Sequence, residues 1–523
     1  MAVVTDKLRL TNCSNFVNGV ANGGYYIFIG FPNAIALYPN WDSTRPDPID
    51  DILYLNSYRD NILGVKKITS SDVIRVIPKI VWTSGKKYDM YRHDYSVYNT
   101  TPVSTSARLY DSSYYVMNSE YRVYICINNN SLPSNSNTGT VSTQQPLHTD
   151  QSPRLESDGY MWKYLYALSP ADVLKFDSTN YISVPSNWET TTNSEIARIR
   201  DNAVSGRIET VLIENNSTQY ILEPGTTTVS NVPIKGDGTS SDGTGNAKAS
   251  VKFDEQGRPS KVTVSDFGKN YTFGTLDLDS MVTSTDGSKA VFNVIIPPPG
   301  GHGANIYNEL GAFRTLVYSR IENDSTNPDF IVGNQFSRIG IIKDVTVNGS
   351  TSIFSSSTGS GVYAIKINED ASAEVYDSVM TQSNTGAIGN LISYDSTTKI
   401  VKYIQPRSNN IDTYAVDSNI QIDYNYANSV TGIQTTSNYK LSNFDNSSFK
   451  IGSNSYTVDT SLTNNANTIV NLGITYYLGQ TFNGGLSSPD INTKSGDILY
   501  VDNRASVTRS SQQREDIKII LEF

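Results

Sequence analysis

The apolar residues of this chain gather in short runs that are rich in β-branched and aromatic side chains and are bounded by Asn, Gly, Ser or Pro. Four such runs lie before residue 205: Tyr25–Phe31, Val73–Trp82, Tyr121–Ile127 and Met161–Tyr166. Runs of this length and composition favour β-strands. The sequence therefore predicts a mainly β protein.

The composition favours the same fold class. Tyr (34 residues) outnumbers Phe (16), and only 18% of the residues are charged, while Asn, Ser, Thr and Gly fill much of the rest. Hydroxyl and amide side chains compete with helical backbone bonding, whereas Tyr and Thr suit pleated surfaces. We expect a two-layer antiparallel β-sandwich core with two inserted small β domains and few short helices. Segments Ser70–Val76 and Pro170–Phe176 are the predicted helices, because each has a Ser cap and an acidic first turn.

A chain of 523 residues is too long for one ordinary core. Aromatic-rich segments alternate with segments rich in Gly, Ser, Thr and Asn, and the Pro- and Gly-rich stretch 295–305 cannot continue a strand or helix. This alternation predicts a scaffold in three parts with two β domains grafted into its loops. The core parts are 1–204, 301–345 and 490–523, and the inserted domains are 205–300 and 346–489.

The first inserted domain contains an internal repeat. Residues 206–220 match residues 257–271, 51 residues further along, with a Gly-Arg turn, an alternating strand and a closing Tyr at the same offsets. A strand starting near Gly287 follows the second copy. We expect the two copies to pack on each other as one small domain.

Two later segments predict defined strands. Residues 389–403 read as a strand pair around the turn Asp395–Lys399. In the closing stretch 516–523 the apolar residues alternate, so they share one face and suit a strand tucked into a sheet: Ile517, Ile519, Leu521 and Phe523.

Charge and cysteine content restrict the partners. The net charge is −10, from 51 acidic and 41 basic residues without a basic run, which disfavours nucleic acid as the main partner. Cys13 and Cys126 are too few for a disulfide framework, and we expect two buried or half-buried thiols. The N-terminus lacks the order of a signal peptide, and no apolar run approaches membrane-spanning length. We expect a soluble product, made in the cytoplasm and without a membrane partner.

Residues with catalytic or metal-binding potential are few. His302 in the stretch Gly300–Gly303 has no second ligand at metal spacing, so a hydrogen-bonded His in a Gly-rich turn is favoured over a catalytic or metal role. His93 beside Asp94 is expected to be a polar surface residue. The run Gly236–Gly245 lacks both calcium-loop and phosphate-loop spacing. We predict no catalytic site, no metal and no cofactor.

The stretch DGYMWKYLYALSP (158–170) has four aromatic residues in seven positions. Strand alternation would place Tyr160, Trp162, Tyr164 and Tyr166 on one face, with Met161, Lys163 and Leu165 on the other. Such a stripe either stacks sugars or bases, or anchors a sandwich core or a subunit interface. With few cations nearby and no catalytic constellation, we favour core or interface.

This stretch, followed by Asn180–Pro185 (NYISVP), resembles a segment of the gene-eight baseplate wedge proteins of T4-like contractile-tailed phages. Further segments are similar to the same family in the same order, and the likeness covers about 1–200, 305–345 and 490–523. These segments are Val3–Arg9, Asn15–Asn18, Val76–Trp82, Ser495–Arg504 (SGDILYVDNR) and the closing IKIILEF.

The resemblance implies a mostly β-sandwich subunit that forms a homodimer and joins other wedge proteins around the central hub. The expected function is that of a non-enzymatic structural subunit of the baseplate wedge in the virion tail, which bridges neighbouring wedge proteins. Trp82 and the four aromatic residues are the expected core or interface anchors, and the family motif places Asn503 and Arg504 at a turn contact.

Two alternatives stay open. A carbohydrate-binding tail protein would touch a host glycan through the inserted domains. A polysaccharide-cleaving tail enzyme would need a carboxylate pair; Asp50–Asp51 and Glu515–Asp516 lack a distinctive setting and read as solvated turn positions.

Overall fold

The computed structural model describes residues 3–32, 40–192, 194–322, 335–405, 443–508 and 513–523. Over these residues the protein is mainly β, and its sheets are built from antiparallel strand pairs such as β1–β18, β5–β7 and β23–β24. The predicted fold class is therefore confirmed.

The chain divides into two units. One unit holds residues 1–17, 74–316 and 520–523, and the other holds residues 18–73 and 317–519. The boundaries fall inside four elements: α1 (Asp6–Ala21), β3 (Val73–Pro78), β17 (Arg314–Glu322) and β32 (Arg514–Glu522). Stretch 205–300 thus belongs to the first unit and stretch 346–489 to the second, and each unit also contains segments from the aromatic-rich parts of the sequence.

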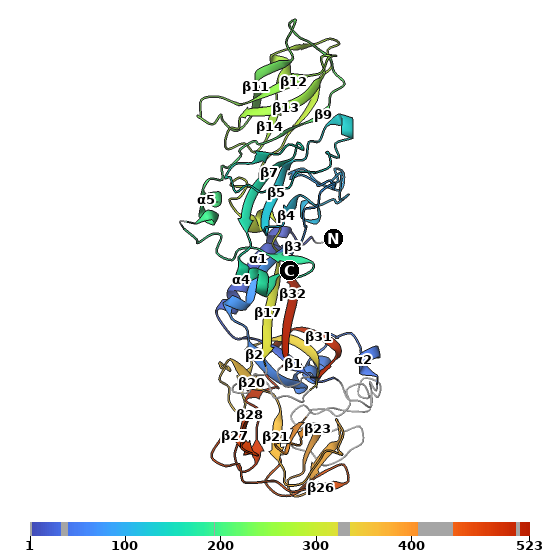
Figure 1. Cartoon of the computed structure of the whole chain (residues 1–523), viewed down its shortest axis with the longest axis vertical. Helices are drawn as coiled ribbons and strands as arrows, with labels where there is room; N and C mark the ends of the chain where they lie inside the picture. The colour runs from blue at the N-terminus through green and yellow to red at the C-terminus, as the bar shows by residue number, and fades with distance from the viewer. Residues whose placement is uncertain (1–2, 33–39, 193, 323–334, 406–442, 509–512) are drawn as a thin grey trace. The chain divides into compact units, whose positions relative to one another are not determined.

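The first unit is built on a four-stranded sheet in the order β4-β5-β7-β6 (Figure 1). Its strands are β4 (Tyr115–Met117), β5 (Arg122–Asn128), β6 (Arg154–Leu155) and β7 (Met161–Ala167). β8 (Tyr181–Ser183) pairs with β3. The helices of this part are α4 (Pro170–Phe176), α5 (Glu195–Asp201) and α6 (Ile306–Glu309).

The repeat segment forms a subdomain of the first unit with its own apolar cluster. Its main sheet has the order β13-β12-β11-β14, and β9 pairs with β16 and β10 with β15. The strands are β9 (Val211–Asn215), β10 (Tyr220–Ile221), β11 (Thr228–Gly236), β12 (Ala247–Phe253), β13 (Pro259–Asp266), β14 (Gly274–Leu276), β15 (Thr283–Ser284) and β16 (Val291–Val294).

The two copies of the repeat interlock, as predicted. Gly206 opens the first copy and lies against the backbone of Tyr271, which closes the second; Gly257 opens the second copy and lies against the backbone of Tyr220, which closes the first. The hydroxyl of Tyr220 accepts a hydrogen bond from the backbone N–H of Ala290 at 3.1 Å, and that of Tyr271 accepts one from Ala247 at 2.8 Å. Each Tyr is thus bound to the segment that follows the other copy.

The second unit contains a five-stranded sheet in the order β20-β2-β1-β18-β31 and a seven-stranded sheet in the order β26-β25-β22-β23-β24-β21-β29 (Figure 1). Strands of the first sheet are β1 (Tyr25–Gly30), β2 (Ile62–Lys67), β18 (Gln335–Lys343), β20 (Thr358–Ser360) and β31 (Asp497–Thr508). Strands of the second are β21 (Tyr363–Lys366), β22 (Val379–Gln382), β23 (Ala387–Asp395), β24 (Ile400–Ile404), β25 (Phe449–Ile451), β26 (Asn454–Tyr456) and β29 (Leu486–Ser487).

Smaller elements complete this unit. Two strand pairs stand outside the large sheets: β19 (Thr346–Val347) with β30 (Ile491–Asn492), and β27 (Ala466–Asn471) with β28 (Ile474–Phe482). Two short helices are α2 (Trp41–Thr44) and α3 (Ile52–Asp60).

Several local predictions are confirmed. α4 spans Pro170–Phe176, and the hydroxyl of its cap residue Ser169 accepts a hydrogen bond from the backbone N–H of Asp172 at 3.0 Å. β23 and β24 form the predicted pair around the turn 395–399. β32 lies beside β17 in a sheet, with Ile517 and Ile519 buried.

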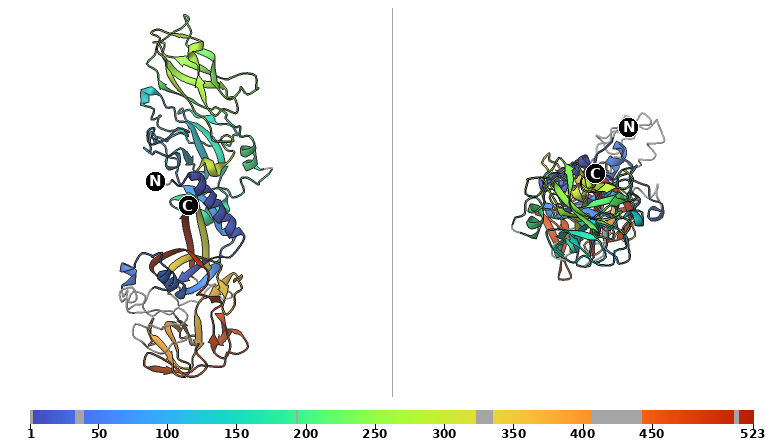
Figure 2. Two further views of the ribbon diagram at one scale, coloured as in Figure 1. Left: turned by 180° about the vertical axis from the view of Figure 1, so that it is seen from behind. Right: turned by 90° about the horizontal axis from the view of Figure 1, so that it is seen from above.

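One of the two helix predictions was wrong, and one helix was missed. Only Ser70–Asp72 form a helical turn, and β3 begins at Val73, because the run Val-Ile-Arg-Val-Ile fits a strand buried on both faces better than a helix. The 16-residue helix α1 was not expected. It is seen from behind in Figure 2, and the ring of Phe16 in α1 lies 5.5 Å from the ring of the C-terminal Phe523.

Candidate interaction core and polar pocket

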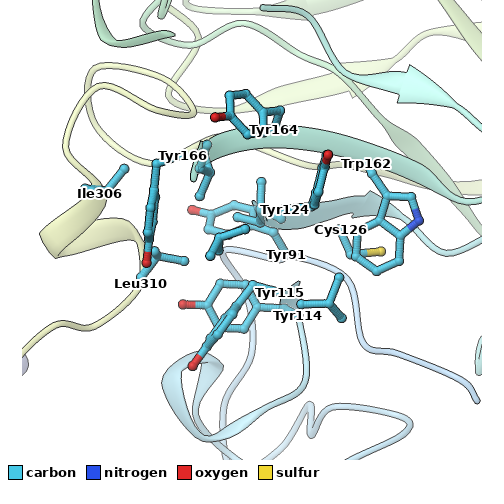
Figure 3. Close-up of a cluster of buried hydrophobic side chains, with 14 of the residues drawn as sticks. Tyr91, Tyr114, Tyr115, Tyr124, Cys126, Trp162, Tyr164, Tyr166, Ile306 and Leu310 are labelled. Carbon is cyan, nitrogen blue, oxygen red and sulfur yellow. The ribbon is translucent and has the colours of Figure 1, made fainter. Parts of the chain in front are cut away.

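The four aromatic residues of the stretch 160–166 are buried in the main core of the first unit. Figure 3 shows Trp162, Tyr164 and Tyr166 in this core. Each is at most 1% exposed. The ring of Tyr160 stacks on Trp162 at 5.4 Å with an interplanar angle of 12°, and Tyr88 meets Trp162 edge-on at 5.9 Å. Rings packed in this way add directional contacts to their large buried area. In the folded protein these side chains are core residues, and no face of them forms a ligand platform.

The prediction that all four rings share one face of the strand was wrong. The register of β5 and β7 shifts, so that Tyr164 pairs with Tyr124 and Tyr166 pairs with the adjacent Val123. Adjacent residues of a strand point to opposite sides of the sheet, so this bulge turns Tyr166 away from Tyr164. Both sides of β7 are consequently buried, including Lys163 and Leu165.

The hydroxyl groups of Tyr160 and Tyr166 are hydrogen-bonded inside the fold. The hydroxyl of Tyr160 donates to the carbonyl of Thr140 at 2.7 Å and accepts from the backbone N–H of Tyr88 at 3.1 Å. The hydroxyl of Tyr166 donates to the carbonyl of Ser183 in β8 at 3.1 Å. These bonds tie loops and a neighbouring strand to β7, which is a structural role for the phenol groups.

Trp82 lies at the margin of the same core and is half-buried. Its indole N–H donates to the hydroxyl of Ser142 at 3.0 Å, and that hydroxyl donates to the carboxylate of Asp158 at 3.0 Å. The same carboxylate oxygen accepts the backbone N–H groups of Thr143 and Gln144. The Asp at the start of the aromatic stretch therefore fixes the loop that covers Trp82.

Asn503 and Arg504 lie in the middle of strand β31, so the predicted turn was wrong at both residues. Asn503 is buried and pairs with Arg338 of β18. Its amide oxygen accepts from Nε of Arg338 at 2.8 Å, and its amide nitrogen donates to the carbonyl of Pro46 at 2.9 Å. Arg504, by contrast, has an exposed side chain, which pairs with Asp502 of the same strand.

Arg338 is a fully buried cation, and no pattern in the sequence predicts its burial. Its guanidinium lies 4.5 Å from the ring centre of Tyr58 and 5.7 Å from that of Trp41, and it donates to the carbonyl of Phe31 at 3.1 Å. Burial lowers the pKa of Arg338 to about 10, so the side chain stays charged at neutral pH. The indole of Trp41 also donates to the carbonyl of Arg504 at 2.8 Å. The side chain of Asn503 and the backbone carbonyl of Arg504 are therefore part of a buried cationic site within the second unit.

A second buried charged group surrounds His302 in the first unit. Nδ1 of His302 lies 2.6 Å from one oxygen of Glu309, and the other oxygen accepts the backbone N–H of Gly303 at 2.7 Å. His302 is thus hydrogen-bonded in a Gly-rich turn, as predicted, and its ring meets Tyr91 edge-on at 4.7 Å. His93 is exposed, as predicted, and accepts a backbone hydrogen bond from Ile296.

Lys163 completes this group. Its ammonium donates to the carbonyl of Gln151 at 2.7 Å, and burial lowers the pKa of Lys163 while the charges of Glu309 and Glu209 oppose that shift. Arg207 pairs with Glu209 at 2.7 Å. No spacing in the sequence links these residues, since the sheet bulge, the repeat subdomain and α6 bring them together.

These side chains border a small polar hollow of about 220 Å³. Its lining residues are Gln151, Ser152, Pro153, Lys163, Asn202, Ala203, Val204, Arg207, Glu209 and His302. Lys163, Arg207 and Glu209 are its charged lining residues, with His302 beside them. Such groups belong to an internal ion-pair network, and hydroxyl groups of a small solute would also satisfy them.

Both cysteines are buried free thiols, as predicted. Burial raises the pKa of Cys13 to about 11 and raises that of Cys126 well above its usual value, so both thiols are protonated at neutral pH. Protonated buried thiols are poor nucleophiles and poor metal ligands.

Within the described part of the chain, no group of three or more His, Cys, Asp or Glu side chains has the arrangement of a metal site. None of the helices in that part is both long and apolar enough to cross a membrane.

No protein-family model matches this chain, and a search of curated proteins finds no significant match to its sequence.

Proposed function

We propose that this chain is a structural subunit of the baseplate wedge of a contractile-tailed phage, and that it links neighbouring wedge proteins through protein–protein contacts. The proposal includes a homodimer within the virion tail and no enzymatic activity. Its basis is the resemblance of several motifs to the gene-eight family and the role of those motifs in this fold.

One observation carries the proposal: the residues of the family-like motifs are architectural. The stretch 158–166 forms the aromatic core of the first unit, and Asn503 holds the buried guanidinium of Arg338 in the second. A motif that served a ligand would keep polar or aromatic surface open to solvent. Motifs whose residues pack in the interior instead support a scaffold protein, which holds its binding surfaces in fixed positions.

The mechanical role follows from rigidity. Sheets with closely packed aromatic cores deform little, so each unit built from them moves as a body when its neighbours move. In a baseplate, such a subunit would transmit the rearrangement that accompanies sheath contraction.

Deletion of the gene distinguishes a structural role in the baseplate from a role in binding to the host cell. Without the protein, we expect infected cells to accumulate incomplete baseplates, seen by electron microscopy of lysates, and a plasmid copy of the wild-type gene to restore complete tails. Complete, normal-looking tails that fail only to adsorb to host cells would contradict the structural role and favour a glycan-binding protein.

A further inference from the structure

The hairpin of β27 and β28, residues 466–482, is unusual in charge. Between Asp459 and Asp490 the sequence contains no acidic, basic or His residue, in a chain whose net charge is −10. Its base is anchored: Leu478 and Phe482 are buried in a small apolar cluster, and Gln480 donates to the carbonyl of Val362 at 2.6 Å. We call residues 466–482 the uncharged arm (Figure 1).

The far end of the arm exposes apolar side chains. Val470 pairs with Thr475, and Thr468 pairs with Tyr477, so Val470 and Tyr477 lie on the face opposite to the buried Leu478. Both are exposed, as is Ile474 next to the turn. Leu472 at the tip is 95% exposed.

The backbone of Leu472 also has a positive φ angle, which is unfavourable for a Leu residue. The turn consists of Leu472 and Gly473, with φ angles of 49° and 78°. Two-residue hairpin turns with both φ angles positive favour Asn-Gly, and a Leu at the first position is strained. The side chain of the neighbouring Asn471 donates to the carbonyl of Thr397 at 2.8 Å and helps to hold the turn, while the side chain of Leu472 stays almost fully exposed. Strain kept at an exposed apolar residue points to a function outside the subunit.

The backbone of the arm offers a second kind of contact. β27 and β28 form a two-stranded sheet, and among the described strands none pairs with the outer edge of β27. Proteins usually guard open edges with Lys or Pro, and the arm contains neither. The N–H and C=O groups along such an edge can pair with a strand of another chain.

The unpaired backbone groups along this edge favour a protein partner over a lipid partner. Unpaired backbone groups cost several kcal/mol each in hydrocarbon, so an open two-stranded ribbon does not insert into a bilayer. A protein that presents its own open strand satisfies those groups, and an apolar pocket beside that strand receives Leu472.

We propose that the uncharged arm docks on a different protein subunit, by adding β27 to an open sheet edge and placing Leu472 in an apolar pocket. This inference rests on the proposed function, which makes the partner another tail protein. The partner surface is uncharged around the pocket, because a charge facing the arm would be desolvated without a counter-charge.

The substitution Leu472→Asn separates docking from folding. Asn tolerates positive φ, so the variant keeps the turn and its thermal unfolding midpoint stays equal or rises. Leu174→Asn is the matched control, since Leu174 in α4 is also exposed, at 85%. In tails purified from phage carrying each variant, we expect at least a tenfold lower amount of the Leu472→Asn protein than of the Leu174→Asn protein. Equal amounts would overturn the inference.

A photo-crosslinker identifies the partner. With benzoyl-phenylalanine in place of Leu472, irradiated tails should give one major crosslink to a strand of a different tail protein, mapped by mass spectrometry. A crosslink to a second copy of this chain, to lipid, or to nothing would overturn the inference. If the wild-type chain itself is missing from purified tails, the proposed function fails instead, so the two failures are distinguishable.

Discussion

At the residue scale, Tyr160 combines a stacked ring with a hydroxyl that serves two backbone groups. We expect Tyr160→Ala to destabilise the first unit by about 3–5 kcal/mol, because it removes buried ring packing and leaves a cavity. Tyr160→Phe should cost about 1–2 kcal/mol through the lost hydrogen bonds. Hydrogen exchange of β7 peptides measures both changes as lowered opening free energies.

The control for this prediction is Tyr98→Ala, since the side chain of Tyr98 is 97% exposed. That change should alter stability by no more than about 0.5 kcal/mol. If Tyr160→Ala left exchange unchanged but abolished binding to a sugar, the aromatic segment would be a ligand site after all.

The neighbours Asn503 and Arg504 should respond very differently to substitution. Asn503→Ala takes the amide oxygen away from the buried guanidinium of Arg338, and we expect a loss of about 2–3 kcal/mol. Arg504→Ala removes a solvent-exposed ion pair and should cost less than about 1 kcal/mol. Urea denaturation of the two variants checks the difference, and equal losses would contradict the assigned roles.

Residue types were easier to predict than residue partners. The aromatic stretch and the two buried thiols follow from composition and spacing in the sequence. The partner of Asn503 does not, because Arg338 lies 165 positions earlier and reaches it only through the pairing of β18 with β31. His302, Glu309 and Lys163 likewise meet only in the folded chain.

At the scale of elements, the interlocked repeat makes a sharp prediction about its glycines. Gly206 has a φ of 63°, and a Cβ there would lie 2.0 Å from the backbone nitrogen of Tyr271. Gly206→Ala should therefore cost well above the roughly 1–2 kcal/mol of a left-handed Ala, because the two copies must move apart. Hydrogen exchange in β9 and β13 should report the loss.

Gly225→Ala is the matched control. Gly225 lies in the same subdomain with a φ of 81°, and nothing lies within 4 Å of the position of its Cβ. This variant should lose only the conformational term, about 1–2 kcal/mol. Equal effects of the two substitutions would contradict the interlocking of the copies.

The repeat subdomain is joined to the rest of its unit by a charged network that predicts a pH dependence. Asp94 binds Arg92 through two hydrogen bonds, and Arg92 also pairs with Glu214 of β9, while Asn293 of β16 donates to Asp94 at 2.8 Å. Burial alone would raise the pKa of Asp94, but the hydrogen bonds and charge of Arg92, with the amide of Asn293, hold it at about 2.

A carboxyl with a lowered pKa stabilises the fold above its unfolded pKa, near 4, and this contribution is lost as the pH falls toward the folded pKa. At pH 6 we expect wild type to be more stable than Asp94→Asn by about 1–2 kcal/mol, after allowing for solvent screening. Near pH 2 the difference should vanish. Urea denaturation at both pH values checks this, and a difference independent of pH would refute it.

Strands and turns were predictable where a short β-branched run ends at a turn residue, as in β1, β7 and the pair β23–β24. Helix α1 was not. Its buried positions Leu10, Cys13 and Val20 lie three and seven residues apart, which is a helical spacing, but the many polar Asn, Ser and Thr residues between them weaken that signal. The helix prediction for 70–76 was wrong for a different reason. A helix-capping pattern is present at its start, but the residues that follow are buried on both faces and form a strand.

At the scale of the whole molecule, the sequence texture identified two stretches that differ from the rest, and the structure assigns one to each unit. The predicted three-part core does not correspond to one unit, since residues 18–73 and 74–204 lie in different units. The predicted boundaries follow changes in amino-acid composition along the chain. A structural unit is instead defined by contacts between distant segments, and these contacts depend on strand pairing, which composition does not specify.

The central claim is that this chain is a stoichiometric part of a contractile tail. Quantitative mass spectrometry of purified tails, with hub proteins as the internal reference, tests it directly. The account predicts a copy number that is a multiple of six, with two copies per wedge for a dimer. Absence of the chain from tails, or a copy number that matches fibre tips instead of wedges, would contradict it.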